Sequence, residues 1–221
     1  MPQGFFELIA ASFALIGSHA AMSAPSIRPR LVDSLGRSGF YVVYALVSLL
    51  TLGVFIWAYG AVESGPDLYQ PLGAGRWVAV FLMPVAVFLV IGRLTTPYGT
   101  PTAPRAPQGI YRICRFPGTI GLLLWVILHL LNLGDARRAL FYLAMGVICV
   151  VALVKNQRLR RSAADSHLES TSIVPFAAIL KGRQRFVWQE IGWGRVALTV
   201  AVYLGFLLGH AYVVGHDPLA G

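Results

Sequence analysis

Six apolar stretches of 16 to 20 residues constrain this chain more than any other feature of its sequence. Crossing a hydrocarbon layer of about 30 Å takes roughly 20 apolar residues in a helix, with about 17 as a lower limit. The two 16-residue stretches therefore need tilted or snorkelling flanks. The sequence predicts an all-α, polytopic transmembrane helix bundle of about six spans. The expected spans are residues 4–22, 40–59, 77–92, 118–134, 139–154 and 196–215.

Charged residues are few in this chain, and most of them are basic. Only 12% of the 221 residues are charged, 57% are hydrophobic, and the net charge is +9. Soluble domains carry about 25% charged residues, and a chain of this length cannot bury so much apolar surface in a soluble core. Basic charge on such an apolar chain is typical of membrane topology rather than of nucleic-acid binding. We expect a lipid bilayer as the partner and no nucleic acid.

The basic residues predict the orientation of the spans. The segments after the first, third and fifth spans hold 15 of the 18 Lys and Arg residues. Cytoplasmic loops carry the excess of Lys and Arg in membrane proteins. Both termini are therefore expected on the non-cytoplasmic side. The first span reads as a retained helix rather than a cleaved signal peptide, because Glu7 precedes it and no Lys or Arg does.

Two segments between the fifth and sixth spans are too short or too charged to cross a membrane. Residues 155–161, KNQRLRR, are expected to continue the fifth helix past the membrane, with their charges facing anionic lipid. Residues 171–180, TSIVPFAAIL, are expected to be interfacial or re-entrant. This stretch is either a lid over a lateral opening or an amphipathic connector.

Three histidines fall within the predicted spans, namely His19, His129 and His210. An ionisable group inside a bilayer is costly, so each is a functional hypothesis. His129 lies deepest, roughly 16 Å past Gly118 at 1.5 Å per residue. Asn132, one turn later, is a candidate hydrogen-bond partner, and Trp125, one turn earlier, is placed to flank a planar ligand.

Two histidines from different spans are a usual way for a membrane bundle to hold a b-type haem, because imidazole suits iron. Span depth pairs His129 with His210 and puts His19 nearer the cytoplasmic face. Spacing alone leaves the pair open. The alternative is that all three are packed polar groups, with the Gly205–Gly209 spacing serving ordinary helix packing.

Other chemistry has little support in the sequence. Cys114 and Cys149 have no CxxC spacing, so neither a structural zinc nor a disulfide is expected. Walker, GxSxG and HExxH motifs are absent. The spans contain no acidic pair that would indicate a carboxylate proton relay.

Three separated motifs resemble the NnrU family of multi-pass membrane proteins. They are SHAAMSAPSIRPRLVDSLGRSGFYVVY at 18–44, GIYRICRFPGTIGLLLWVILHLLNLGD at 109–135 and STSIVPFAAILKGR at 170–183. The resemblance covers nearly the whole chain and implies one NnrU-like transmembrane domain over residues 1–221. It also implies a bacterial inner (cytoplasmic) membrane protein, associated with nitrite and nitric oxide metabolism in denitrification.

The same family resembles the 15-cis-ζ-carotene isomerases, membrane enzymes that use haem b. Their two histidine ligands fall in contexts that match His19 and His129 here, which selects His19 over His210 as the partner. Trp125 begins the matching Trp-x-x-x-His element. The resemblance thus implies haem b as cofactor and an apolar or polyene substrate. A second copy of the chain, in a homo-oligomer, is a further candidate partner. Val126 stands where the isomerases carry a cysteine proposed to exchange with the second ligand.

A second alternative comes from Arg115–Phe116–Pro117. Family relatives commonly carry Arg-His-Pro, which also occurs in membrane methyltransferases that bind S-adenosylmethionine. Phe116 departs from that motif, and no paired-glutamate motif follows. Arg112 and Arg115 are then candidates for a cofactor phosphate or carboxylate, or for haem propionates. A non-catalytic assembly or regulatory membrane protein is the third hypothesis.

Overall fold

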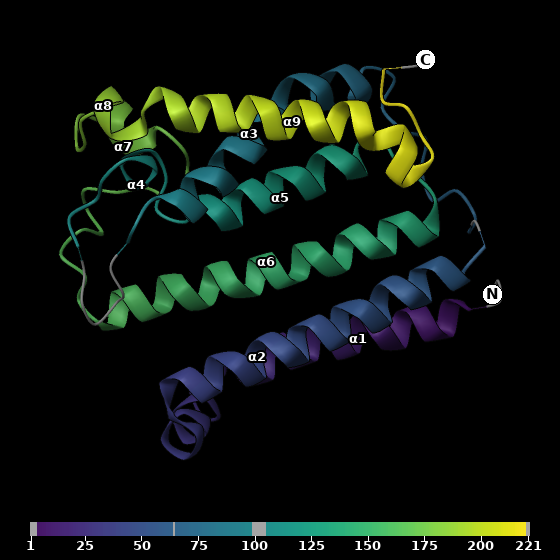
Figure 1. The fold of residues 1–221 in the computed structure, drawn as a ribbon, viewed down its shortest axis with the longest axis horizontal. Helices are drawn as coiled ribbons and strands as arrows, with labels where there is room; N and C mark the ends of the chain where they lie inside the picture. The colour runs from purple at the N-terminus through teal and green to yellow at the C-terminus, as the bar shows by residue number, and fades with distance from the viewer. Residues whose placement is uncertain (1–3, 64, 99–104, 220–221) are drawn as a thin grey trace. The chain divides into compact units, whose positions relative to one another are not determined.

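The computed structural model describes residues 4–63, 65–98 and 105–219. The named elements in these residues are all helices, and the only strand-like feature described is one isolated antiparallel bridge between Asp67 and Asp135. The helices are α1 (Phe5–Met22), α2 (Arg28–Ala61), α3 (Gly75–Thr95), α4 (Ile110–Ile113), α5 (Pro117–Leu130), α6 (Ala136–Ser162), α7 (Ala177–Leu180), α8 (Trp188–Ile191) and α9 (Trp193–Val214) (Figure 1).

Five of the described helices are long and apolar enough to cross a membrane, namely α1, α2, α3, α6 and α9. Large apolar side chains on α2 and α9, such as Leu50 and Phe206, point outward. In water such a surface would be costly, whereas lipid chains solvate it without penalty. The helices therefore indicate a multi-pass membrane protein.

The helix bounds differ from the expected spans in an instructive way. The third and fifth stretches are 16 residues long by hydropathy, yet α3 has 21 residues and α6 has 27. Backbone hydrogen bonding continues a helix through polar residues, so hydropathy marks only its membrane-facing part. The α5 helix, expected over 118–134, has only 14 residues and is the short one. Its end at Leu130 follows from the next residues, because the Leu131 carbonyl accepts from the Leu72 N–H at 3.0 Å.

The chain forms two compact units. The first comprises Met1–Pro71 and Leu133–Val151, and the second comprises Leu72–Asn132 and Ala152–Gly221. The first unit contains α1, α2 and the greater part of α6. Its core is a cluster of apolar side chains from these helices: Phe5, Leu8, Ala11, Leu15, Phe55, Ala58, Val62 and Ala144. Two of its rings, Phe55 and Phe141, stack with centroids 5.1 Å apart.

A short connection closes the first unit at one end. The Leu68 N–H donates to the Gly134 carbonyl at 2.8 Å, and the Ala136 N–H donates to the Pro66 carbonyl at 3.0 Å. A Cβ at Gly134 would lie 2.0 Å from the Tyr69 carbonyl oxygen, so only glycine allows this approach.

The second unit is built on close packing of α3 against α5. A Cβ at Gly121 of α5 would lie 2.7 Å from the Ala86 carbonyl oxygen of α3. Helix α9 packs along α3, and its Tyr203 hydroxyl donates to the Val80 carbonyl at 2.7 Å. The short helices α4, α7 and α8 gather at one end of this unit (Figure 1). The buried cluster there consists of Leu89, Ile110, Tyr111, Ile113, Cys114 and Ile191.

The two short segments before α9 were partly predicted. Residues 155–161 continue α6, which runs to Ser162, as expected. One of their charges is placed differently from the expectation: Arg160 is buried in the protein rather than facing lipid. Residues 171–180 form a bend and a turn followed by α7, and the Phe176 N–H donates to the Ile113 carbonyl at 2.9 Å.

Candidate functional site

His19 lies near the end of α1 in the first unit, half-buried. Its Nδ1 is 2.9 Å from the Leu15 carbonyl oxygen, one turn earlier on the same helix. A carbonyl can only accept, so this contact assigns a proton to Nδ1, and in the neutral ring the lone pair is then on Nε2. The Tyr44 ring of α2 meets the imidazole edge-on at 5.8 Å between centroids.

His129 belongs to the second unit and is the penultimate residue of α5. It lies about 18 Å along the helix from Pro117 at 1.5 Å per residue. Its Nδ1 is 2.8 Å from the Trp125 carbonyl oxygen, again one turn earlier. The tautomer that this contact selects is the same as at His19.

The expected neighbours of His129 are partly in the predicted roles. The Trp125 ring lies beside the imidazole, with centroids 4.9 Å apart and planes at 57°, as a flanking residue would. The Nδ2 of Asn132 donates to the Gly75 carbonyl at 3.1 Å and to the Leu128 carbonyl at 2.7 Å. Asn132 thereby holds the end of α5 against the start of α3.

His210 also belongs to the second unit, on α9. Its Nδ1 lies 2.7 Å from the carbonyl oxygen of His216, which follows the end of the helix. Each of the three candidate histidines thus has a backbone carbonyl at Nδ1.

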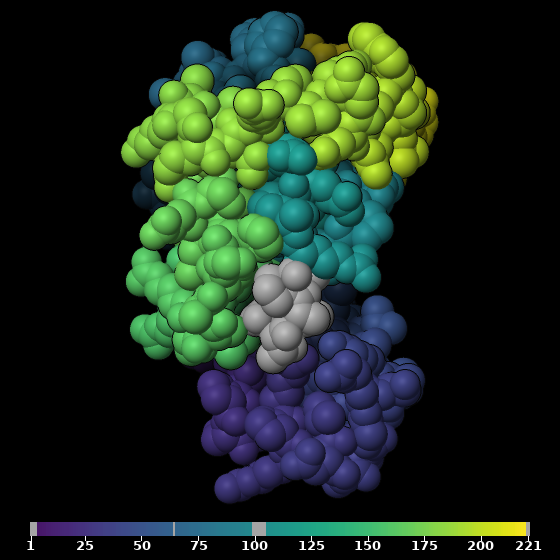
Figure 2. Space-filling model, turned by 90° about the vertical axis from the view of Figure 1, so that its left-hand side faces the viewer, coloured from purple at the N-terminus to yellow at the C-terminus, as the bar shows by residue number. Residues whose placement is uncertain are grey.

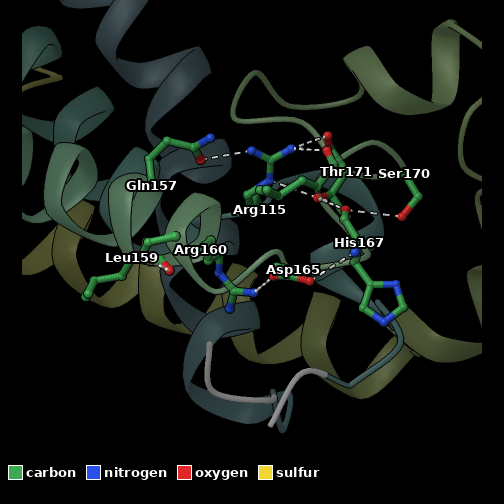
Figure 3. A network of polar contacts seen from close by, with 10 residues as sticks. Arg115, Gln157, Leu159, Arg160, Asp165, His167, Ser170 and Thr171 are labelled. Atoms are coloured by element: carbon green, nitrogen blue, oxygen red, sulfur yellow. Dashed lines mark hydrogen bonds and ion pairs between the residues drawn. The ribbon is translucent and has the colours of Figure 1, made fainter. Parts of the chain in front are cut away.

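Arg115 is the centre of a buried polar network at the other end of the second unit (Figure 3). Its Nε donates to Thr171 Oγ1 at 2.8 Å and its Nη1 to Gln157 Oε1 at 2.8 Å. Its Nη2 donates to the carbonyl oxygens of Leu168 and Thr171. One guanidinium therefore ties the start of α5 to α6 and to the loop before α7.

A second buried arginine completes this network. Arg160 of α6 forms an ion pair with Asp165, and both side chains are buried (Figure 3). Burial alone raises the pKa of the Asp165 carboxyl, but the His167 N–H and the Arg160 guanidinium donate to it and hold the pKa below its ordinary value. The Arg160 guanidinium also lies 4.5 Å from the centre of the Tyr98 ring. Sequence reasoning missed this pair because it assigned the whole basic run to lipid.

Arg112 and Glu190 form the third charged contact of this end. Two hydrogen bonds join the guanidinium to the carboxylate, Nε to Oε2 at 2.7 Å and Nη2 to Oε1 at 2.8 Å. The Gly109 N–H adds a third donor to Glu190 at 2.6 Å, and Arg112 Nη1 donates to Gln184 at 2.7 Å. The bond from Arg112 lowers the pKa of Glu190 despite partial burial. The two arginines of the methyltransferase hypothesis are thus both engaged with protein acceptors.

The two cysteines are buried and form no disulfide. Burial raises the pKa of the Cys114 thiol to about 11, and its Sγ donates to the Ile173 carbonyl at 3.2 Å. A thiol in this state is packed rather than nucleophilic. Within the described residues no group of three or more His, Cys, Asp or Glu side chains could hold a metal ion.

Comparison with known proteins shows the family to which the chain belongs. The family model described as NnrU protein matches residues 7–218. The chain is also 27% identical, over 184 residues, to the 15-cis-zeta-carotene isomerase of Arabidopsis thaliana chloroplasts. That match covers 78% of this chain and 49% of the isomerase, so the chain spans about half the length of that relative. No solved structure matches. Because the family model covers nearly all of its residues, the chain belongs to the NnrU protein family.

Proposed function

We propose that this NnrU family protein is a haem b protein of the bacterial inner membrane, in which His19 and His129 would hold the haem iron. The observation that carries the proposal is the hydrogen bond at Nδ1 of both histidines, to Leu15 at 2.9 Å and to Trp125 at 2.8 Å. Histidines that bind metals commonly donate their other ring N–H to a carbonyl or carboxylate, which fixes the tautomer and the ring orientation. The donor chemistry of both residues therefore fits haem iron.

The choice of His19 over His210 rests on the elements that hold them. For His19 and His129 the acceptor is the carbonyl four residues earlier on the same helix, so the ring is fixed by a rigid element. For His210 the acceptor follows the end of α9. An aromatic ring also lies beside each member of the favoured pair, Tyr44 beside His19 and Trp125 beside His129. His210 lies in the same unit as His129, which keeps it as the rival that the experiment must test.

The activity that we favour is an isomerisation of an apolar, polyene-like substrate, in keeping with the named isomerase to which the chain is similar. Bound haem would supply ferrous iron that lowers the double-bond character of the polyene. The chain itself would contribute a dry, apolar approach from the lipid, and Trp125 would flank the planar group. Val126 carries no thiol, so this position could not exchange with His129 as an iron ligand. The alternative role is in nitrite and nitric oxide metabolism, which the family resemblance implies.

The test is an absorption spectrum of protein purified in detergent after expression with added haem precursor. The wild type is expected to keep a Soret band, and both His19→Ala and His129→Ala are expected to lose it. His210→Ala is the matched control, because it removes a half-buried imidazole of the same type. If His210→Ala loses the Soret band and His19→Ala keeps it, His210 rather than His19 is the second ligand. Colourless wild-type protein that is folded by circular dichroism would overturn the proposal and favour a non-catalytic membrane protein.

A further inference from the structure

The segment between the Arg115 network and α9 exposes large apolar side chains. Leu180 of α7 is 84% exposed, Val174 is 64% exposed and Trp193 is 73% exposed. We call the exposed apolar side chains of this segment the connector surface: Val174, Phe176, Leu180, Phe186, Trp188 and Trp193. In Figure 2 the end of the second unit that carries this segment faces the viewer, in light green to yellow-green.

The aromatic members of the connector surface form a continuous row. Ring centroids are 6.5 Å apart from Phe176 to Phe186, 6.3 Å from Phe186 to Trp188 and 4.9 Å from Trp188 to Trp193. Phe176 is held at a φ of 61°, a conformation that bulky residues rarely adopt. Its N–H is fixed by the Ile113 carbonyl, so the protein maintains an outward-facing phenylalanine at a cost in backbone strain.

Basic side chains accompany this row. Lys181, Arg183 and Arg185 are exposed and lie between Leu180 and Phe186 in the chain. The one acidic residue of the 171–193 segment is Glu190, whose carboxylate is already neutralised by Arg112. The segment therefore presents positive charge next to aromatic rings, the combination that binds the interface of an anionic membrane.

Contacts with the neighbouring helices place the segment where α3 ends and α9 begins. Arg195, in the first turn of α9, donates from Nε to Thr95 Oγ1 at 2.8 Å and from Nη2 to the Thr95 carbonyl at 2.9 Å. Thr95 is the last residue of α3, so the α3 end and the α9 start lie at one level. The connector surface is joined directly to that level through Trp193.

We propose that the connector surface lies in the headgroup region of the bilayer, with Lys181, Arg183 and Arg185 binding the phosphates of anionic lipids. The segment is then a fixed interfacial anchor of the second unit, not a lid that opens to admit substrate. This proposal rests on the apolar helices and the exposed side chains, and it is independent of haem binding.

Depth is measured with a nitroxide on Leu180→Cys, in full-length protein with Cys114→Ser and Cys149→Ser, in lipid nanodiscs. A label in the headgroup region is expected to collide with oxygen more than with a water-soluble nickel chelate. The ratio of the two collision rates should lie between the ratio for free label in water and the ratio for a label at Phe206→Cys on α9. A label as open to nickel as free label in water would overturn the proposal, because the surface would then be hydrated. A label open to neither agent would also overturn it, because protein would then cover the surface. The Phe206→Cys label is also the folding control. If it behaves as lipid-exposed, the protein that lacks Cys114 and Cys149 is folded.

Lipid selectivity is measured by the phosphatidylglycerol retained after purification from mixed nanodiscs with phosphatidylcholine. The triple variant Lys181→Gln/Arg183→Gln/Arg185→Gln is expected to weaken binding roughly fivefold for each side chain at low salt. Arg30→Gln/Arg37→Gln/Arg105→Gln is the matched control, because it removes three exposed arginines elsewhere in the chain. Equal loss of anionic lipid in both variants would refute binding at the connector surface.

Discussion

Arg112 and Glu190, 78 residues apart in the chain, meet as a planar guanidinium and a carboxylate joined by two hydrogen bonds of 2.7 and 2.8 Å. Their side chains are 24% and 29% exposed, so water screens the pair only in part. The pair joins α4 to α8, which precede α5 and α9 respectively. A contact of this geometry fixes orientation as well as distance, because both partners are planar.

Glu190→Gln is expected to lower stability by about 1–2 kcal/mol, because it removes charge-assisted hydrogen bonds while Arg112 stays partly buried. The loss should appear as a lower Tm in detergent. Glu169→Gln makes the same change at an exposed carboxylate and should leave Tm unchanged. Equal shifts in the two variants would mean that the Arg112–Glu190 contact adds no stability.

Acid should destabilise the second unit in a predictable window. The pKa values of Glu190 and Asp165 lie below their ordinary values of 4.5 and 3.8, because Arg112 donates to Glu190, and His167 and Arg160 donate to Asp165 strongly enough to outweigh its burial. The folded protein then binds fewer protons than the unfolded chain, so these groups stabilise fully above about pH 4.5 and lose that contribution as pH falls through the folded pKa. Tm measured from pH 7 to pH 3 should therefore fall below pH 4.5. The fall should be shallower in Glu190→Gln, and an identical slope would contradict the assignment.

Arg115→Ala should release the loop before α7. The substitution leaves Thr171, Leu168 and Gln157 without their shared donor in a buried place, which costs about 2–4 kcal/mol. Hydrogen exchange should rise at residues 165–173 before it rises elsewhere. Arg183→Ala, which removes an exposed arginine with a single bond to the Glu169 carbonyl, is the control and should change exchange little. If the loop stays protected in Arg115→Ala while haem is lost, Arg115 is a cofactor contact instead.

Gly121→Ala should disturb the helix that carries His129. The new Cβ would lie 2.7 Å from the Ala86 carbonyl oxygen, so α5 must move away from α3 at a cost of about 1–3 kcal/mol. Gly205→Ala is the matched control, since nothing lies within 4 Å of its Cβ position. A lower Tm is expected for the first variant alone, together with a shifted or weaker Soret band if haem binds as proposed. No difference between the two would mean that α3 and α5 do not pack this closely.

Much of the helical framework could be predicted because hydropathy acts locally. Each long apolar stretch needs its backbone bonds satisfied within the stretch when it lies in lipid, and only a helix does this within one segment. The ends were harder to predict. The α5 helix stops at Leu130 because the Leu131 carbonyl is taken by Leu72, a residue 59 positions earlier, and no local signal announces this. The α3 and α6 helices run on into polar residues, because backbone hydrogen bonding does not depend on the hydropathy of the side chains.

The sequence by itself determined the helical class, the membrane setting, the family resemblance and the three histidines that are candidate ligands. The Trp125–His129 contact was also predictable, because residues four apart share a helix face. Only the tertiary structure determined which charged side chains are buried in the protein. Arg160 and Arg161 are neighbours in one basic run, yet Arg160 is buried on Asp165 and Arg161 is exposed. Desolvating a charge requires partners brought together by the fold, and no local pattern shows where those partners lie.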